Sequence, residues 1–157
     1  MRRLTLLTVA LAFAAPAFAQ LPNPYGASIT LDQAKKIATL SVAEAAKNSW
    51  KMAIAIVDVA GDLVYFEKMD GTQVASVNIA QDKARSSVRF KRPTKAMQDV
   101  LAQGGAGVRF LALQGAIPVE GGLPIVMDGK IVGAIGASGG TSDQDGLTAK
   151  AGADSVK

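Results

Sequence analysis

The sequence predicts an α+β fold in which helices pack on an antiparallel β-sheet. Two pairs of short segments rich in Ile, Val and Ala are each joined by a tight turn, which is typical of β-hairpins. Other segments have apolar residues that recur at helical spacing. A parallel doubly wound sheet requires a regular alternation of strand and helix, and this alternation is absent, so the antiparallel arrangement is favoured.

The N-terminus has the organisation of a cleaved secretion signal. Two arginines are followed by an apolar stretch over residues 4–15 and by the small-x-small cleavage pattern Ala17-Phe18-Ala19. The alternative is a transmembrane anchor, but the apolar run is shorter than the roughly 20 residues that cross a bilayer. We therefore expect a signal peptide over residues 1–19, a mature chain that begins at Gln20, and a periplasmic or secreted protein with no membrane anchor.

The first elements of the mature chain are an arm and a helix. Residues 20–28 contain two prolines and a glycine, which predicts an extended arm. One domain is expected to cover residues 29–157. Thr30 and Gln33 have the spacing of a capping box, and apolar residues follow at helical spacing, so a helix is predicted over residues 31–48.

Two β-hairpins are predicted. Strands at residues 52–59 and 63–66 flank a turn that contains Gly61. Strands at 123–127 and 130–137 flank Asp128-Gly129, a dipeptide typical of a tight two-residue turn.

The remaining segments are predicted to be mainly helical. Helices are expected over residues 74–90 and from a capping Thr94 to residue 101. Residues 109–113 and 117–119 are candidate short strands, although the first also suits a helix. Ser142 with Asp145 is expected to cap a C-terminal helix that ends near residue 153.

The composition excludes several classes of function. The 157 residues include no histidine and no cysteine, so zinc sites, Ser-His-Asp triads, disulfides and histidine-ligated haem are excluded, and no metal site is expected. Signal removal takes two of the 17 basic residues against 13 acidic ones, which leaves a net charge near zero. Such a charge argues against nucleic acid as the main partner. Without disulfides, the fold must depend on packing, to which oligomerisation is expected to contribute.

A glycine-rich motif ends the second hairpin. Residues 136–140 match the G-x-S-x-G pattern of serine hydrolases around Ser138. A serine nucleophile needs a base, and the mature chain has neither histidine nor a Ser-x-x-Lys pair, so a hydrolase is disfavoured. Two interpretations stay open: Gly139 and Gly140 permit close backbone approach at a strand end, or their amides bind an anionic group of a ligand.

A run of cations lies between residues 83 and 95, with no acidic residue among them. It is either a solvated helix face or an anion-recognition edge suited to carboxylates or haem propionates, since guanidinium groups bind carboxylates bidentately. The six cations are Lys83, Arg85, Arg89, Lys91, Arg92 and Lys95.

The chain resembles the GlcG/HbpS-like family of small haem-binding proteins, which are sometimes called haem-degrading. The resemblance extends from about residue 29 to residue 156. It is carried by Val57-Asp58-Val59-Ala60-Gly61, Lys68-Met69-Asp70-Gly71, Ile79-Ala80 with Lys83-Ala84, Phe90 with Thr94, Gly121-Gly122-Leu123-Pro124-Ile125, and Gly133-Ala134-Ile135-Gly136-Ala137-Ser138-Gly139-Gly140 with Asp143 and Asp145.

The resemblance implies a profilin-like fold, with an antiparallel sheet between helices in α/β/α layers, which assembles into oligomers and in several members binds haem. The expected ligand-binding residues are the family positions together with two arginines of the cation run and three glycines: Met69, Asp70, Lys83, Thr94, Ser138, Asp145, Arg89, Arg92, Gly122, Gly139 and Gly140. Weak axial ligands to haem iron would come from Met69, Tyr65, Lys83 or a threonine such as Thr94, because members that use histidine cannot serve as models here.

The function implied by the resemblance is binding of haem or a related tetrapyrrole outside the cytoplasm, in carriage, sequestration or redox sensing. Two alternatives stay open. One is an enzyme or accessory protein that acts on a small organic acid, with a small carboxylate as ligand. The other is an oligomeric scaffold without a ligand. Whether the chain catalyses a reaction also stays open.

Overall fold

The computed structural model describes residues 22–156, so the expected signal peptide lies outside the described residues. Four strands form one antiparallel sheet in the order β2-β1-β4-β3. The strands are β1 (Ala53–Val57), β2 (Leu63–Lys68), β3 (Gly122–Met127) and β4 (Lys130–Ser138). The helices are α1 (Leu31–Lys47), α2 (Ser76–Phe90), α3 (Thr94–Ala102), α4 (Ser142–Ala153) and the 3-10 helices η1 (Gly105–Ala112) and η2 (Asp154–Val156).

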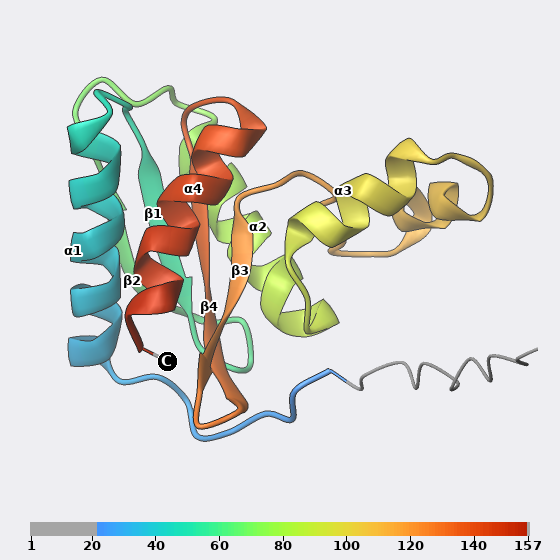
Figure 1. The fold of residues 1–157 in the computed structure, drawn as a ribbon, viewed down its shortest axis with the longest axis horizontal. Helices are drawn as coiled ribbons and strands as arrows, with labels where there is room; N and C mark the ends of the chain where they lie inside the picture. The colour runs from blue at the N-terminus through green and yellow to red at the C-terminus, as the bar shows by residue number, and fades with distance from the viewer. Residues whose placement is uncertain (1–21, 157) are drawn as a thin grey trace, which may run out of the picture.

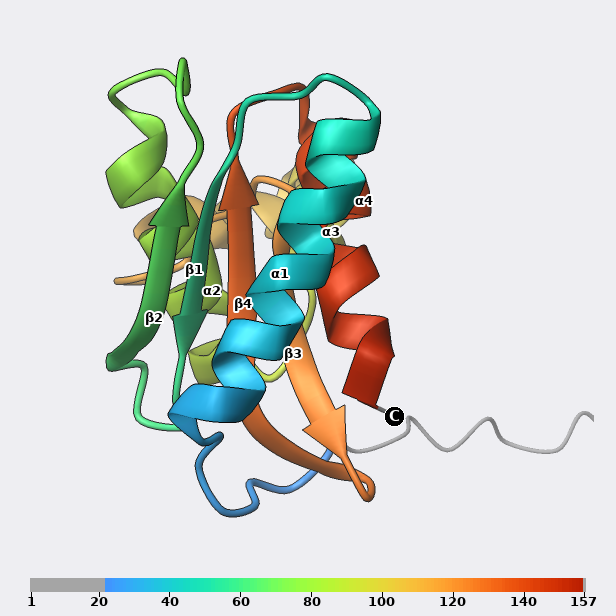
Figure 2. The ribbon, with the colours of Figure 1, turned by 90° about the vertical axis from the view of Figure 1, so that its left-hand side faces the viewer.

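The sheet lies between two helical layers, as Figures 1 and 2 show. Alternate residues of β1 point to opposite faces. Ile54 and Ile56 pack with α1 and α4, whereas Ala53 and Ala55 pack with α2. The α+β class and the three-layer arrangement are therefore confirmed.

Small residues allow α2 to lie close to the sheet. A Cβ atom on Gly136 of β4 would lie 2.0 Å from the carbonyl oxygen of Ala80 and 2.7 Å from the amide nitrogen of Ala84. Only glycine fits at this contact, so Gly136 determines how closely α2 approaches β4.

Both predicted hairpins and the first helix cap are confirmed. β1 pairs with β2, and β3 pairs with β4 around Asp128-Gly129. The Thr30 hydroxyl accepts a hydrogen bond from the Gln33 amide, and the Gln33 side chain accepts one from the Thr30 amide, which completes the capping box.

The strand prediction is wrong for residues 117–119, whereas at 109–113 the structure confirms the helical alternative. Residues 109–112 belong to η1, and residues 117–119 are not in a strand. The positive φ angles of Gly104 (69°) and Gly105 (53°) turn the chain into η1. In Figure 1 this segment projects away from the sheet together with α3, so it has no neighbouring strand with which to pair.

Two predicted caps are also wrong. Thr94 is the first residue of α3, and its side chain makes no capping bond. The cap of α4 is Thr141, whose hydroxyl accepts from the Gln144 amide, rather than Ser142 with Asp145. The Asp145 carboxylate is instead directed into the interior of the protein.

None of the helices formed by residues 22–156 is both long and apolar enough to cross a membrane.

Candidate functional site

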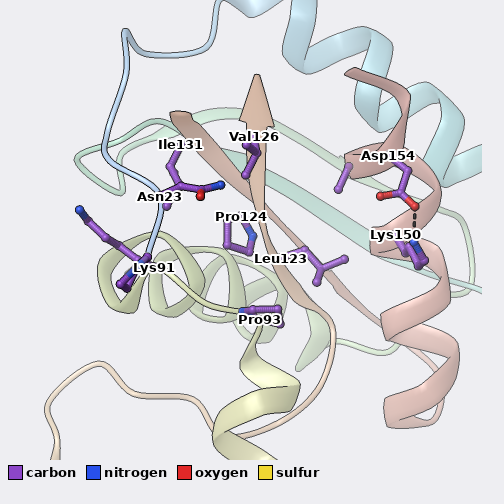
Figure 3. Close-up of a pocket in the computed structure, with 11 residues that line it drawn as sticks. Asn23, Lys91, Pro93, Leu123, Pro124, Val126, Ile131, Lys150 and Asp154 are labelled. Carbon is purple, nitrogen blue, oxygen red and sulfur yellow. Dashed lines mark hydrogen bonds and ion pairs between the residues drawn. The ribbon is translucent and has the colours of Figure 1, made fainter. Parts of the chain in front are cut away.

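An apolar groove of about 580 Å³ lies beside β3, the edge strand of the sheet. Figure 3 shows the end of α2 and the start of α3 on one side of it and α4 on the other. The apolar part of its lining is formed by Pro22, Pro93, Leu123, Pro124, Val126, Ile131 and Ala153. Its volume is within the usual range for sites that bind small molecules or cofactors.

Two lysines lie at opposite sides of this groove. Lys91 follows α2, and its ammonium lies 4.1 Å from the centroid of the Tyr25 ring. Lys150 lies on α4 and is paired with Asp154 of η2. The groove therefore combines apolar walls with a cation on the α2 side and an ion pair on the α4 side.

A smaller hollow of about 260 Å³ continues the groove along β3 and shares Pro93, Leu123 and Lys150 with it. Lys95 and Glu120 line this hollow, and their charged groups lie 3.6 Å apart. Gly121 and Gly122 line it as well.

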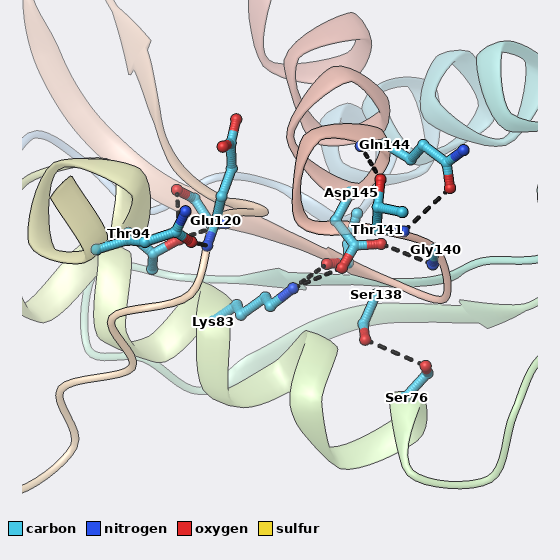
Figure 4. Close-up of polar contacts among 12 residues, drawn as sticks. Ser76, Lys83, Thr94, Glu120, Ser138, Gly140, Thr141, Gln144 and Asp145 are labelled. Atoms are coloured by element: carbon cyan, nitrogen blue, oxygen red, sulfur yellow. Dashed lines mark hydrogen bonds and ion pairs between the residues drawn. The ribbon is translucent and has the colours of Figure 1, made fainter. Parts of the chain in front are cut away.

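A buried ion pair lies next to these glycines, and Figure 4 shows its two residues, Lys83 and Asp145. Lys83 Nζ of α2 lies 2.6 Å from Asp145 Oδ2 of α4, and the two side chains are 1% and 5% exposed. Lys83 also donates to the carbonyl of Ala137 at 3.3 Å, while the Gly140 amide donates to Asp145 Oδ1 at 3.0 Å. Burial raises the pKa of the Asp145 carboxyl above its usual value, and Lys83 and the Gly140 amide oppose that shift.

The sequence makes room for this pair with small residues. A Cβ on Gly121 would lie 2.9 Å from Lys83 Nζ, and one on Gly122 would lie 2.4 Å from the Lys83 carbonyl oxygen. The Thr94 hydroxyl accepts from the Gly122 amide at 2.9 Å and so attaches the start of α3 to β3. These contacts hold α2, α3 and α4 in fixed positions around the groove.

The structure brings four of the expected site residues into this one buried cluster, Lys83, Thr94, Gly122 and Asp145, and the exposed Gly140 donates its amide to it. Ser138 lies at the end of β4, and its hydroxyl donates to that of Ser76 at 3.1 Å. A Cβ on Gly139 would lie 2.0 Å from the carbonyl oxygen of Lys51, so this glycine does permit a close backbone approach. The anionic group that the Gly140 amide binds belongs to Asp145 of the same chain.

The other expected residues lie elsewhere. Met69 packs against the core on the α1 side, and Asp70 is exposed after β2. Tyr65 donates to Glu67 at 2.9 Å on β2. Arg89 lies beside Gly61, and Arg92 donates to the carbonyl of Phe90. None of these residues lines the groove.

Sequence reasoning did not single out most of the groove residues. Lys91 belongs to the cation run but was not among the site candidates, and no local signal distinguishes Lys150 from an exposed helix lysine. The one sequence signal for the groove was the apolar motif at 122–125, which is part of the family resemblance. Its residues on β3 form one wall of the groove.

The lining of the groove defines what it can bind. It contains no histidine, cysteine, methionine or tyrosine side chain, and the part of the chain that the structure describes holds no cluster of potential metal ligands. The groove therefore suits an apolar molecule with an anionic edge near Lys91, held mainly by burial and charge.

Comparison with known proteins relates most of the chain to one family. Residues 29–154 match the family described as haem degrading protein HbpS-like. A 15.0 kDa protein from the dhaT–dhaS intergenic region of Citrobacter freundii is 33% identical over 126 residues, which cover 79% of this chain and 89% of that protein. Protein GlcG of Escherichia coli K12 is 36% identical over 95 residues, which cover 60% and 69% of the two chains.

Solved structures share the fold. An HbpS double mutant from Streptomyces reticuli superimposes with a TM-score of 0.76 at 27% identity, covering 97% of this chain and 99% of that one. A structure described as a complex of PduOC with haem superimposes with a TM-score of 0.75, covering 83% and 96% of the chains. At 23% identity this second likeness concerns the fold alone.

Proposed function

The chain belongs to the HbpS-like family, and from this premise we propose that it binds haem or a related tetrapyrrole in the groove beside β3. The family description refers to haem, and a protein of the same fold is described in complex with haem. The observation that carries the proposal is the groove itself, whose apolar walls are bordered by Lys91 on one side and Lys150 on the other.

The groove residues fit the organic part of haem. Leu123, Pro124 and Val126 offer apolar surface along β3, and each 100 Å² of buried porphyrin surface contributes about 2.5 kcal/mol. Lys91 can pair with a propionate, whereas Lys150 is already paired with Asp154 and contributes less net charge. Bound haem would supply a redox-active iron, while the chain binds and orients the macrocycle.

None of the axial ligands that the sequence predicted lines the groove. Lys83 is paired with Asp145, the Thr94 hydroxyl is bonded to Gly122, and Met69 lies on the α1 side of the sheet. We therefore propose that binding depends little on iron, and that the physiological role is carriage, sequestration or redox sensing of the tetrapyrrole.

Titration of the mature protein with haem and with metal-free protoporphyrin, followed by absorbance, tests the proposal. The two affinities should agree within about tenfold, because burial and propionate pairing are common to both ligands. Lys91→Ala should weaken both by about fivefold, which corresponds to roughly 1 kcal/mol for one partly exposed ion pair. Arg89→Ala is the matched control, since Arg89 lies outside the groove.

Three results would contradict this account. Haem binding a thousandfold tighter than the metal-free ring would mean that iron ligation dominates. An equal effect of Lys91→Ala and Arg89→Ala would place the anionic edge elsewhere. Absence of any porphyrin binding, together with a rise in melting temperature on adding small carboxylates, would favour the organic-acid alternative.

We also propose that the protein is exported, from the signal pattern in the first 19 residues. The intact mass of protein recovered from the periplasm or medium should correspond to a chain that begins at Gln20. A mass that still includes residues 1–19 would overturn the proposed localisation.

A further inference from the structure

The N-terminal arm, residues 22–28, lies outside the segment that matches the family, yet it forms part of the groove. Pro22 and Asn23 line the groove, and Figure 3 shows Asn23 facing it from the same side as Lys91. The Ile131 amide donates to the Pro24 carbonyl at 2.8 Å, and the Gly26 amide donates to the Ile131 carbonyl at 2.8 Å. The arm is thus hydrogen-bonded to the start of β4.

Tyr25 connects this arm to the end of α2. Its hydroxyl donates to the carbonyl of Val88 at 2.8 Å. Its ring lies 4.1 Å from the ammonium of Lys91, within the distance at which a cation is attracted to an aromatic face. One side chain therefore contacts both the last turn of α2 and the cation that borders the groove.

The backbone at Lys91 supports a specific role for this contact. Lys91 has φ 52° and ψ 39°, the left-handed conformation in which helices commonly end and which glycine usually occupies. A residue with a Cβ atom pays about 1 kcal/mol to adopt this conformation. Here that residue lines the groove and carries a long cationic side chain, whose ammonium is held against the ring of Tyr25.

We propose that Tyr25 is the positioning residue of the groove: it holds the N-terminal arm in place as a wall and keeps the Lys91 ammonium at the rim of the groove, where the anionic edge of a ligand would meet it. This inference rests on the proposed function and deepens it. It assigns the preference for an anionic porphyrin to a segment outside the matched family domain, so the arm tunes which tetrapyrroles bind.

Four mature proteins test the proposal: the parent, Tyr25→Phe, Tyr25→Leu and the control Tyr65→Phe, which alters the other tyrosine of the chain on β2. The ligands are metal-free protoporphyrin and its dimethyl ester, which lacks the propionate charges. Hydrogen exchange at the Gly26 and Ile131 amides measures, without any ligand, how firmly the arm is hydrogen-bonded to β4. The melting temperature shows whether each variant folds as stably as the parent.

Tyr25→Leu should speed hydrogen exchange at both amides. It should weaken binding of protoporphyrin by about tenfold but binding of the dimethyl ester by only about threefold, since the ester has no charge to pair with Lys91. Tyr25→Phe keeps the ring under Lys91 and loses the hydroxyl bond, so it should retain the parent's preference for the acid over the ester. Tyr65→Phe should change neither readout. If Tyr25 only stabilised the fold, Tyr25→Leu would weaken binding of the acid and of the ester by the same factor.

The outcomes separate this inference from the proposed function. Unchanged exchange in Tyr25→Leu, or faster exchange with unchanged porphyrin affinity, overturns the inference while porphyrin binding by the parent still supports the function. If the parent binds neither porphyrin, the proposed function fails and the ligand part of the inference fails with it. Exchange at Gly26 then still decides whether Tyr25 holds the arm.

Discussion

At the scale of single residues, the Lys83–Asp145 pair has the largest energetic consequences. Its two charges lie 2.6 Å apart and are almost fully removed from water. A buried pair of this kind gains little over an apolar pair, but removal of one partner leaves an uncompensated buried charge. The pair links α2 to α4, the helices that carry or precede the two groove lysines, so loss of one partner also disturbs the groove.

Lys83→Met should lower the free energy of unfolding by about 3–5 kcal/mol at neutral pH. Burial already raises the pKa of Asp145, and loss of the Lys83 ammonium removes an effect that opposes this rise. A carboxyl with a raised folded pKa stabilises the fold below its unfolded pKa of about 3.9, and this stabilisation is lost as pH rises through the folded pKa. The deficit of Lys83→Met should therefore shrink toward pH 4, as denaturant unfolding at several pH values would show.

The matched control is the double variant Lys83→Met with Asp145→Asn, which removes both charges and keeps an acceptor for the Gly140 amide. Its stability should lie nearer to the parent's at neutral pH, without the added dependence on pH. A single variant whose deficit is constant from pH 4 to pH 7 would contradict the assignment of this cost to the Asp145 charge.

At the scale of elements, α4 shows how one segment serves two purposes. Thr141 and Gln144 cap the helix reciprocally, which leaves Asp145 in the first turn available for Lys83. The same turn places Gly146 against Glu120, where a Cβ would lie 2.2 Å from Glu120 Oε1. The position of the first turn of α4 therefore depends on three features together: the Thr141 cap, the buried Asp145 carboxylate and the close contact that Gly146 allows with Glu120.

Thr141→Ala should lower the free energy of unfolding by about 1 kcal/mol, because the Gln144 amide loses its acceptor. Ser142→Ala, the neighbouring substitution, should change stability by about 0.5 kcal/mol or less, since Ser142 is not the cap. Thermal or denaturant unfolding of the two variants measures the difference. A larger effect at Ser142 than at Thr141 would show that the cap was misassigned.

At the scale of the whole molecule, exposed apolar residues gather on the segment that projects from the sheet beyond α3 in Figure 1. Val108, Leu111, Leu113 and Val119 are 50%, 68%, 42% and 41% exposed. Several exposed large apolar side chains within one short segment are typical of a contact with another chain. We propose that the protein assembles into oligomers through this segment.

Light scattering of the mature chain should give a mass several times that of the monomer. Leu111→Lys should shift the particle toward the monomer, because a charge placed in an apolar contact is costly. Leu40→Lys on α1 is a control at another exposed leucine, 46% exposed against 68% for Leu111, outside the segment. A monomeric parent at micromolar concentration would contradict the proposal, and equal effects of both variants would contradict its location.

The sequence by itself determined the α+β class, both hairpins, the first capping box and the family. The fold class, the hairpins and the cap depend on local physical chemistry: the period of the apolar residues, the Asp128-Gly129 turn and the spacing of Thr30 and Gln33. The family came instead from the resemblance of the motifs along the chain. The strand candidates at 109–113 and 117–119 did not form, because a segment with β propensity becomes a strand only where a neighbouring strand supplies hydrogen bonds. The helical alternative for 109–113 was confirmed over residues 109–112.

Only the tertiary structure decided the functional geometry. Lys83 and Asp145 are 62 positions apart and meet because Gly121 and Gly122 leave space for the pair at β3. The groove likewise joins the arm, the end of α2, β3 and α4, which no spacing along the chain relates. Charge and polarity patterns show that a lysine is present, but its partner depends on which elements the packed core brings within a few ångströms of it, and that is a property of the whole fold.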